Sequence, residues 1–595
     1  MLQLNDGNAA RSEPFGQRGN MTSRYHIELI KPSHYDDQGY VIQWWRASVP
    51  SNSLASLYAI VLDAAERKVL GEAVAITQDA WDECNTVISP ARVAHRIREA
   101  NGGGIVFLVG VQSNQYPRAM DIARELRARG IAVVIGGFHV SGCLSMLPDM
   151  PDDLQEALDL GVTLFAGEAE GHIDELLRDA FAGRLRPVYN RLKDLPVLEG
   201  APSTFLPAES LRRYLPPIGS FDAGRGCPFQ CSFCTIINVQ GRKSRYRSAD
   251  DVERLLRANL SKGVYRFFIT DDDFARNRNW EPILDRIIEM REREGIYLRF
   301  IIQVDALAYR IPNFVEKCKR AGCLRVFIGL ESVSPENLLQ AKKRQNKVGD
   351  YRAMLRTWRA AGIMTFCGYI LGFPGDSVAS IERDIATIQR ELPLDILEFF
   401  ILTPLPGSED HQKLHRRGVP MDSDMNKYDV EHVTTAHAQM SAEAWQDIYR
   451  RAWRLYYSWD HIKTLLRRAV TDGIDARRLM LSIVQFRSIP LYEKVHPLQG
   501  GYIRRKIRTL RRPGLPREPA LFFYPRRLAE TLATLARTLG ALWRIDRIRR
   551  RAIREAKVSR YTDRAITSQP ADLEEVPDTH ALVRDPIHSQ GLRVV

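Results

Sequence analysis

Short apolar runs alternate with helix-like segments in the first third of the chain. Residues 104–110 and 131–137 are continuous apolar runs, the second ending in two glycines, and the helix-like residues 119–129 separate them. Strand, helix and strand at this spacing indicate a parallel α/β unit, and uninterrupted apolar strands suit a sheet that is covered on both faces. We expect a Rossmann-like domain over residues 25–190, with its ligand edge at the carboxyl ends of the strands.

A second and longer alternation follows a proline-punctuated segment, residues 191–217, which we interpret as a linker. Its strand-like runs are residues 219–222, 266–270, 298–304, 325–330, 364–371 and 394–402. A helix-like segment lies between each run and the next. Six strands with five intervening helices predict an α/β fold of the (βα)6 partial TIM-barrel type over residues 218–420, with function at the carboxyl ends of the strands.

The pattern changes after residue 420. We expect helices over residues 421–500 and a basic amphipathic helical segment over residues 501–565. Between Gly501 and Arg564 there are 19 Lys or Arg against 5 Asp or Glu, which accounts for the whole formal charge of +13. The apolar positions recur at three- and four-residue steps, and they are Leu528, Leu532, Leu535, Leu539, Leu542 and Ile545.

Three interpretations of this basic helix remain open at this point. It can lie on an anionic membrane surface, bind the phosphates of a nucleic acid, or pack on the barrel with a solvated arginine face. The sequence offers no strong evidence for nucleic acid. Peripheral contact with the inner membrane is therefore the partner interpretation that we keep beside simple packing.

The two ends and the cysteine content bear on location. We interpret residues 1–24 and 566–595 as flexible tails. The N-terminus lacks a basic region followed by an apolar core, and no apolar run approaches the roughly 18 residues that a spanning helix needs. Eight cysteines in 595 residues do not make a disulfide framework. We expect a cytoplasmic protein in a reducing compartment.

Three of the cysteines carry the clearest chemistry. Cys227, Cys231 and Cys234 have the spacing CxxxCxxC and come directly after the first predicted barrel strand. Three thiolates from one tight loop can each bind one iron of a [4Fe–4S] cubane, which leaves the fourth iron without a protein ligand. A zinc ion would need a fourth ligand, and neither a His nor a further Cys lies near this loop in the sequence.

This motif resembles that of the radical S-adenosylmethionine (SAM) superfamily. The resemblance implies that SAM chelates the open iron and is cleaved reductively to a 5′-deoxyadenosyl radical. It places Phe233 against adenine and Asp271 or Asp272 near the SAM amino group, where many relatives have Gly-Gly-Glu. It also places Glu331 toward the ribose and Gly372 where adenine approaches closely.

The N-terminal part resembles the cobalamin-binding domain that precedes the barrel in one radical SAM subfamily. The resemblance rests on residues 136–141, on residues 167–170 before a Leu-Leu helix, and on the strand order. The cobalamin contacts that it implies are Ser113, Gly136, Gly137 and His139. The D-x-H-x-x-G motif is missing, so cobalamin would bind without a His ligand to cobalt. The alternative is a Rossmann-like domain that has lost its cofactor.

The implied function is cobalamin-dependent methylation of an unactivated carbon. A cobalamin-associated radical oxidoreductase, cyclase or rearrangement enzyme is the nearest alternative, and a non-catalytic iron–sulfur or cobalamin sensor is a different one. Methylthiotransferases place three more cysteines in the N-terminal domain, whereas this one has only Cys84 and Cys143. The expected partners are a small-molecule or lipid substrate and a reductant such as flavodoxin or ferredoxin. The sequence names neither a catalytic residue nor the substrate.

Overall fold

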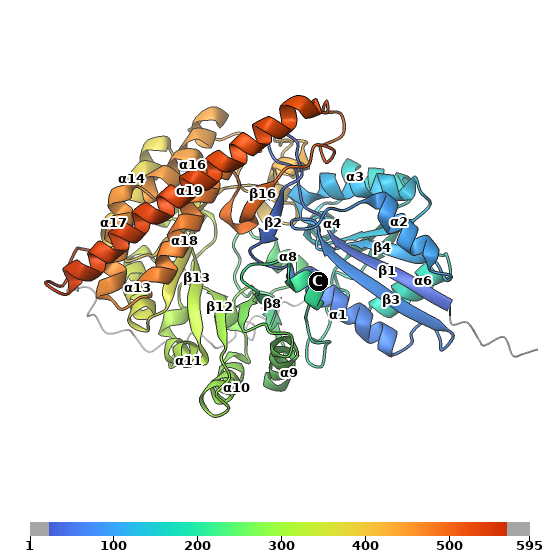
Figure 1. The fold of residues 1–595 in the computed structure, drawn as a ribbon, viewed down its shortest axis with the longest axis horizontal. Coiled ribbons are helices and arrows are strands. Elements are labelled where there is room, and N and C mark those ends of the chain that lie inside the picture. Colours follow the sequence, from blue (N-terminus) through green and yellow to red (C-terminus); the bar gives the residue numbers. More distant parts are fainter. Residues whose placement is uncertain (1–22, 568–595) are drawn as a thin grey trace, which may run out of the picture.

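The structure is a computed structural model that describes residues 23–567, and it is built around two parallel sheets of six strands each (Figure 1). The predicted tails lie almost entirely outside the described residues. The first strand already begins at Ser23, two residues before the predicted domain start.

The N-terminal sheet has the strand order β3-β1-β4-β5-β6-β7, with all neighbours parallel. Its strands are β1 (Ser23–Lys31), β3 (Val74–Asp82), β4 (Gly104–Leu108), β5 (Ala132–Gly136), β6 (Thr163–Ala166) and β7 (Val188–Asn190). Its main helices are α1 (Asn52–Glu66), α2 (Pro90–Glu99), α3 (Tyr116–Arg127), α4 (Phe138–Met146), α5 (Asp152–Asp159) and α6 (Ile173–Phe181).

Both faces of this sheet are covered, as the continuous apolar strands predict. In β4, Ile105 and Phe107 pack in one core with α1 and α6, while Val106 and Leu108 pack in a second core with α2, α3 and α5. The side chains of a strand alternate between its faces, so an apolar residue is needed at every position.

The second sheet has the order β15-β14-β13-β12-β11-β8, which is the reverse of the chain order, and all its neighbours are parallel. Its strands are β8 (Gly219–Phe221), β11 (Arg266–Ile269), β12 (Arg299–Val304), β13 (Cys323–Glu331), β14 (Met364–Leu371) and β15 (Ile396–Ile401). The connecting helices are α9 (Ala249–Leu260), α10 (Trp280–Glu292), α11 (Phe314–Ala321), α13 (Tyr351–Ala360) and α14 (Val378–Glu391), with the short α12 (Pro335–Gln340) before α13. A strand lies at each of the six sequence runs from which strands were predicted.

The C-terminal region begins with α16 (Ala442–Tyr456), α17 (Trp459–Thr471) and α18 (Ala476–Ser488). The prediction of helix from residue 501 onward is wrong for its first part. Residues Gly501–Arg505 form β16, which pairs antiparallel with β2 (Gln43–Ala47) of the N-terminal part. Prolines at 513, 516 and 519 cannot donate helical hydrogen bonds, and the long helix α19 starts only at Ala520 and runs to Ala556.

The predicted apolar face of this helix is also only partly packed. Of its six positions, only Ile545 is buried and Leu542 is half-buried; Leu528, Leu532, Leu535 and Leu539 are exposed. The interpretation of a helix packed on the barrel by this face is therefore wrong for the first half of α19. Among the described helices we find none that combines the length and the apolar character needed to cross a bilayer.

Candidate cluster and cofactor site

The three cysteines lie on one loop at the carboxyl edge of the second sheet. The loop follows β8 and the short β9 (Gly224–Arg225) and ends at α8 (Ile236–Val239). Cys231 is buried, and Cys227 and Cys234 are half-buried. The backbone N–H of Cys234 donates to the carbonyl of Cys231 at 3.2 Å, which turns the loop tightly enough to bring both side chains to one place.

Burial favours the neutral, protonated form of two of these thiols. It raises the pKa of Cys227, and nearby Asp273 raises it further. Burial together with the neighbouring Cys231 raises the pKa of Cys234 to about 12. Neutral thiols are poor ligands, so binding of a metal centre must remove these protons, and the raised pKa values make that removal costlier at neutral pH.

The number of thiol ligands suits a cluster better than a single zinc ion. A structural zinc ion takes four protein ligands. A cubane that takes one iron per thiolate can be held by these three cysteines and leaves its fourth iron open.

Two of the predicted SAM contacts hold the cluster loop in place. Both oxygens of Asp271 are occupied, one by the N–H of Ala223 at 2.6 Å and one by the Asn277 amide at 2.9 Å. Asp272 accepts the N–H of Gly226 at 2.8 Å. Burial raises the pKa of each of these two carboxyl groups to about 7. A contact with SAM stays a prediction, and Asp272 meets it more readily because only one of its oxygens has a hydrogen bond.

The predicted ribose contact, Glu331, forms a buried ion pair with Lys343. Glu331 ends β13 in a left-handed conformation (φ +62°), where the register with β14 shifts by one residue. Burial lowers the pKa of Lys343, but the charges of Glu331 and Cys231 outweigh burial and raise it overall. The ammonium also lies 5.8 Å from the centre of the Phe233 ring. The buried ammonium of Lys343 therefore lies near Phe233, Glu331 and Cys231.

Sequence reasoning missed Lys343 and its neighbour Gln345. The Gln345 side-chain amide donates to the sulfur of Cys231 at 3.6 Å. Both residues follow α12 in an irregular segment where polar residues are common, so no periodic pattern marks them. The sequence feature that could have indicated them is their position, within fifteen residues after the strand-end Glu331.

The predicted adenine site is built around Gly372, which has φ +103°. A side-chain carbon at this position would lie 1.9 Å from Trp445 of α16, so the protein itself requires glycine here. Asp376 accepts the N–H groups of Gly372 and Phe373 at 2.9 and 3.0 Å and fixes the turn. Phe373 in turn meets Phe233 edge to face, with ring centres 6.5 Å apart.

Glu398 is a further acidic group that the sequence analysis did not select. It lies on β15 directly opposite Gly368 of β14. It points to the same face as Phe400, which packs in the apolar cluster with Phe233. One carboxyl oxygen has no hydrogen-bond partner among the described residues, and burial followed by the charge of Glu331 raises its pKa well above the usual range. The signal was a single acid inside the otherwise apolar run Ile396–Ile401.

The predicted cobalamin contacts separate into two groups. His139 is buried, and its ring nitrogens lie 3.1 Å from the Ser113 hydroxyl and 2.9 Å from an Asp153 oxygen. Both nitrogens are thus engaged, and the ring packs on that of Tyr116 at 4.3 Å. Ser113 and His139 do not line the cavity at the edge of this sheet, whereas Gly136 and Gly137 do.

This cavity, of about 180 Å³, lies between the two sheets. The carboxyl ends of β4, β5 and β6 line one side with Phe107, Val134 and Phe165, and Val239 and Gln240 of the cluster region line the other. Gly110, Gly136, Gly137 and Gly167 lie on the wall of the N-terminal sheet. Gly137 (φ +148°) also approaches the Val111 backbone so closely that a side-chain carbon would lie 2.2 Å from its nitrogen.

A buried ion-pair network joins this cavity to the cluster loop. Arg225, two residues before Cys227, lies 2.5 Å from Glu168 and 2.6 Å from Glu170, which follow β6, and 3.1 Å from Asp222 at the end of β8. The opposite charges give the guanidinium of Arg225 a raised pKa despite its burial. The Gly-Glu-Ala-Glu segment of the N-terminal part is therefore docked on the backbone that carries the cysteines.

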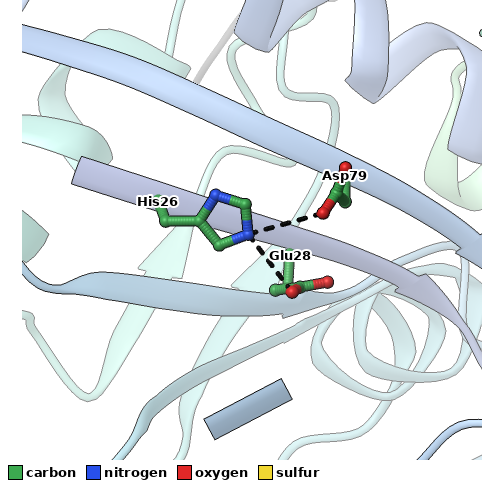
Figure 2. Close-up of side chains that lie close together, drawn as sticks. All are labelled: His26, Glu28 and Asp79. Carbon is green, nitrogen blue, oxygen red and sulfur yellow. Dashed lines mark hydrogen bonds and ion pairs between the residues drawn. The ribbon is translucent and has the colours of Figure 1, made fainter. Parts of the chain in front are cut away.

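A second group of potential metal ligands lies on the N-terminal sheet (Figure 2). The Nε2 of His26 is 3.2 Å from Glu28 and 3.7 Å from Asp79. The Arg96 guanidinium, however, lies 2.5 Å from Glu28 and 3.8 Å from Asp79, and Trp81 donates to the other oxygen of Glu28. Arginine already supplies the positive charge, so we interpret this group as an ion-pair network.

Comparison with known proteins agrees with the cluster geometry. Residues 223–388 match the family model of the radical SAM superfamily. The bacteriochlorophyllide d C-12(1)-methyltransferase of Chlorobaculum tepidum is 28% identical over 350 residues, covering 57% of this chain and 72% of that protein. The hopanoid C-2 methylase of Rhodopseudomonas palustris is 26% identical over 358 residues, covering 59% and 64%.

Two solved structures have a similar fold. The radical SAM methyltransferase TsrM from Kitasatospora setae, with cobalamin and a [4Fe–4S] cluster bound, covers 78% of this chain and 98% of its own, with a TM-score of 0.55 at 15% identity. The cobalamin-dependent radical enzyme OxsB with aqua-cobalamin bound covers 90% and 80%, with a TM-score of 0.50 at 13% identity. The cysteine loop, the parallel sheet that carries it and the family match agree, and residues 223–388 of this chain form a domain of the radical SAM superfamily.

Proposed function

We propose that this protein is a cobalamin-dependent radical SAM methyltransferase that acts on an unactivated carbon. The observation that carries the proposal is the cavity between the sheets, with glycines on one wall and the cluster region on the other. The named methyltransferase relatives support the reaction class. On this account the second sheet serves as a (βα)6 partial barrel and the N-terminal sheet as a Rossmann-like cobalamin domain.

Cys227, Cys231 and Cys234 would hold the [4Fe–4S] cluster. When bound, the cluster supplies the electron for reductive cleavage of SAM to a 5′-deoxyadenosyl radical. The chain's own residues position and shield this chemistry. Gln345 donates a hydrogen bond to the Cys231 sulfur and so fixes its position. Lys343 keeps the charge of Glu331 balanced in a buried place.

SAM itself would be held from three sides. Phe233 offers an apolar face, the turn at Gly372 offers backbone groups, and Glu331 offers a carboxylate already oriented by Lys343. Asp272 is the remaining acceptor for the SAM amino group. Each group reaches the site from the carboxyl end of a different strand or from the cluster loop, as expected of a barrel-type site.

Cobalamin fits the cavity in part. The glycines leave room against the strand ends, and the apolar wall of Phe107, Val134 and Phe165 suits a ring system. Since His139 has both nitrogens engaged, cobalamin would bind without a histidine ligand. When bound, methylcobalamin would supply the methyl group. About 180 Å³ holds only a part of so large a cofactor, so the remainder would lie outside this cavity.

The substrate is proposed to be a small molecule or a lipid, and the electron donor a flavodoxin or ferredoxin. The names of the relatives include a bacteriochlorophyllide and a hopanoid as substrates, both extended apolar ring systems. Glu398 supports a polar contact to such a substrate. Its raised pKa favours the protonated form of the carboxyl group, and the oxygen that has no partner among the described residues lies on the face of the sheet that carries the SAM residues.

Anaerobic reconstitution with hydroxocobalamin tests the proposal. We expect about one corrin per chain by absorbance, and we expect Gly136→Leu, which fills the cavity wall without left-handed strain, to lose the corrin while it keeps its iron. Gly349→Ala is the control, because nothing lies within 4 Å of that position. A wild-type chain that holds a full cluster but no corrin would rule out the cobalamin-dependent reaction.

A further inference from the structure

The first half of helix α19 turns polar side chains toward the protein and apolar side chains toward the solvent, which is the reverse of the usual arrangement. From Tyr524 to Gly540 none of its residues is buried. The half-buried positions in this stretch are Arg527, Glu530, Thr531, Thr534 and Thr538. A helix packed on a protein core normally turns its apolar stripe inward. Here the body of the protein receives threonines and an ion pair.

The outward face carries a continuous apolar stripe instead. Its members are Leu521, Tyr524, Leu528, Leu532, Leu535, Leu539 and Trp543 at steps of three and four residues. Leu528, Leu532, Leu539 and Trp543 are 57–62% exposed, and Leu535 is 37% exposed. At 1.5 Å per residue the stripe extends for about 33 Å. Single exposed leucines are ordinary, but a continuous stripe of this length marks an interaction surface.

The charged residues of α19 also differ between the exposed and the half-buried positions of the helix. Every exposed charged side chain of the helix is an arginine, and these are Arg526, Arg537, Arg544, Arg547, Arg550, Arg551 and Arg554. Its three acids are half-buried and each is paired with arginine: Glu530 with Arg526 and Arg527, Asp546 with Arg549 and Arg550, and Glu555 with Arg467 and Arg551. The exposed surface therefore offers only apolar groups and positive charge.

The remainder of the helix anchors this surface to the protein. Beyond Gly540, the residues Ala541, Ile545 and Ala552 are buried, and this half packs along α17 and α18 (Figure 1). Arg544 stacks over Trp459 of α17 at 3.8 Å. A rigid, anchored helix thus holds its apolar stripe away from the core.

We propose that α19 docks in the plane of an anionic lipid bilayer. The apolar stripe would enter the boundary between headgroups and acyl chains, the flanking arginines would meet anionic headgroups, and Trp543 would lie at the interface. A second copy of this chain fits the surface less well, because it would bring an identical row of arginines against the first. The inference is independent of the cobalamin chemistry proposed above.

Vesicle flotation of the whole protein tests this docking. The probes are vesicles of phosphatidylcholine alone and of phosphatidylcholine with 30% phosphatidylglycerol, each at 0.1 M and 0.5 M NaCl. We expect binding to the anionic vesicles to be at least about tenfold tighter than to the neutral ones, and to weaken in high salt. Absent binding, or equal binding to both vesicles, would overturn the proposal.

Matched variants separate the stripe from general surface effects. Leu532→Glu with Leu539→Glu should lower vesicle binding at least about tenfold, because the charges would have to enter the acyl boundary. Tyr265→Glu with Tyr297→Glu makes the same change at two exposed aromatic residues near the start of β11 and β12, and should leave binding unchanged. Unchanged circular dichroism and iron content show that each variant is folded.

Two further results would contradict the docking of α19 on a bilayer. If light scattering shows a dimer that the leucine variant abolishes, and wild type ignores the vesicles, the stripe is an interface between copies. If the leucine variant binds vesicles as wild type does, the stripe is not the docking surface. Arg537→Gln with Arg547→Gln should reduce the preference for anionic lipid while leaving the apolar stripe intact.

Discussion

Lys343 is the residue on which the electrostatics of the candidate site depend. It is buried, paired with Glu331, and close enough to Cys231 for that thiol to raise its pKa. A buried carboxylate without a partner costs far more than one at the surface. The lysine therefore allows Glu331 to remain charged where a ribose is expected to bind.

Lys343→Met should weaken SAM binding. Without the ammonium, Glu331 loses its buried ion-pair partner, at a cost of about 3–5 kcal/mol. We expect the dissociation constant for SAM, measured by calorimetry on reconstituted protein, to rise at least about tenfold, which is ~1.4 kcal/mol. Lys342→Met is the matched control, because its pair with Glu409 is more exposed and worth about 0–1 kcal/mol. Equal SAM affinity in both variants would contradict this role.

His432 is a second residue whose charge stabilises the fold. Burial alone lowers its pKa, but hydrogen bonds to Asp37 at 3.1 Å and Asp429 at 2.9 Å outweigh burial and raise it to about 10. A raised pKa means that the folded state favours the protonated form. The stabilisation is therefore complete below the unfolded value of about 6.5 and is lost as the pH rises through about 10.

Chemical denaturation at pH 6.5 and pH 9.5 measures this contribution. Wild type should lose more of its free energy of unfolding between the two values than His432→Gln does. The neighbouring Glu431 also has a raised pKa, which the charge of His432 partly lowers, so the comparison is made in a Glu431→Gln background, where this coupling is absent. The same loss in the variant would show that His432 does not carry the effect.

At the scale of elements, the turn after β14 shows a constraint that is internal to the protein. The resemblance to the radical SAM superfamily places adenine near Gly372. The structure places Trp445 of α16 directly against this glycine. Gly372→Ala combines left-handed strain with overpacking, so we expect a loss of about 2–4 kcal/mol of stability. Thermal unfolding measures it, with Gly349→Ala as control. If the two variants melt alike, Trp445 does not require the glycine.

The elements themselves were largely predictable, because their signals are local. Apolar runs located all six strands of the second sheet, and the CxxxCxxC spacing located the cluster loop. Pairing of β16 with β2 was not predictable, since it joins residues more than 450 positions apart. The face on which α19 packs was also missed, because periodicity identifies an apolar stripe but does not say whether the core or another partner covers it.

The residues of the candidate site also divide into those that have a local sequence signal and those that do not. The cysteines were selected by spacing and the strand-end groups by their position after apolar runs, and the roles of both stay predictions. Lys343, Gln345 and Glu398 were missed because a loop lysine, a loop glutamine and an acid in a strand gain meaning only from their neighbours in space. His139 was assigned to cobalamin by resemblance, and only the structure shows that Ser113 and Asp153 engage both its nitrogens.

At the scale of the whole molecule, the two sheets are joined by charge. Arg225 connects the cluster loop to Glu168 and Glu170, and Arg245 pairs with Glu168 as well. The segment predicted to be a linker is not loose, since Leu206, Leu211 and Tyr214 are buried in the shared core. The N-terminal sheet is therefore held at a fixed place beside the cluster.

Arg225→Met should loosen this junction. Glu170 would be left buried without its partner and Glu168 with Arg245 alone, at a cost of about 3–5 kcal/mol. We expect limited proteolysis to cut between residues 191 and 217 faster than in wild type, and corrin binding to weaken while iron is retained. Arg254→Met is the control, because its side chain is largely exposed. An unchanged proteolysis pattern would mean that apolar packing alone holds the sheets together.

The central claim is a cluster held by three cysteines that leaves one iron free for SAM. Electron paramagnetic resonance of the anaerobically reconstituted, reduced protein tests it without knowledge of the substrate. We expect about four irons per chain and a [4Fe–4S]⁺ signal whose g values shift when SAM is added, with the signal lost in Cys231→Ser and kept in Cys84→Ser. A signal that SAM leaves unchanged, or a protein that retains zinc in place of iron, would contradict the account.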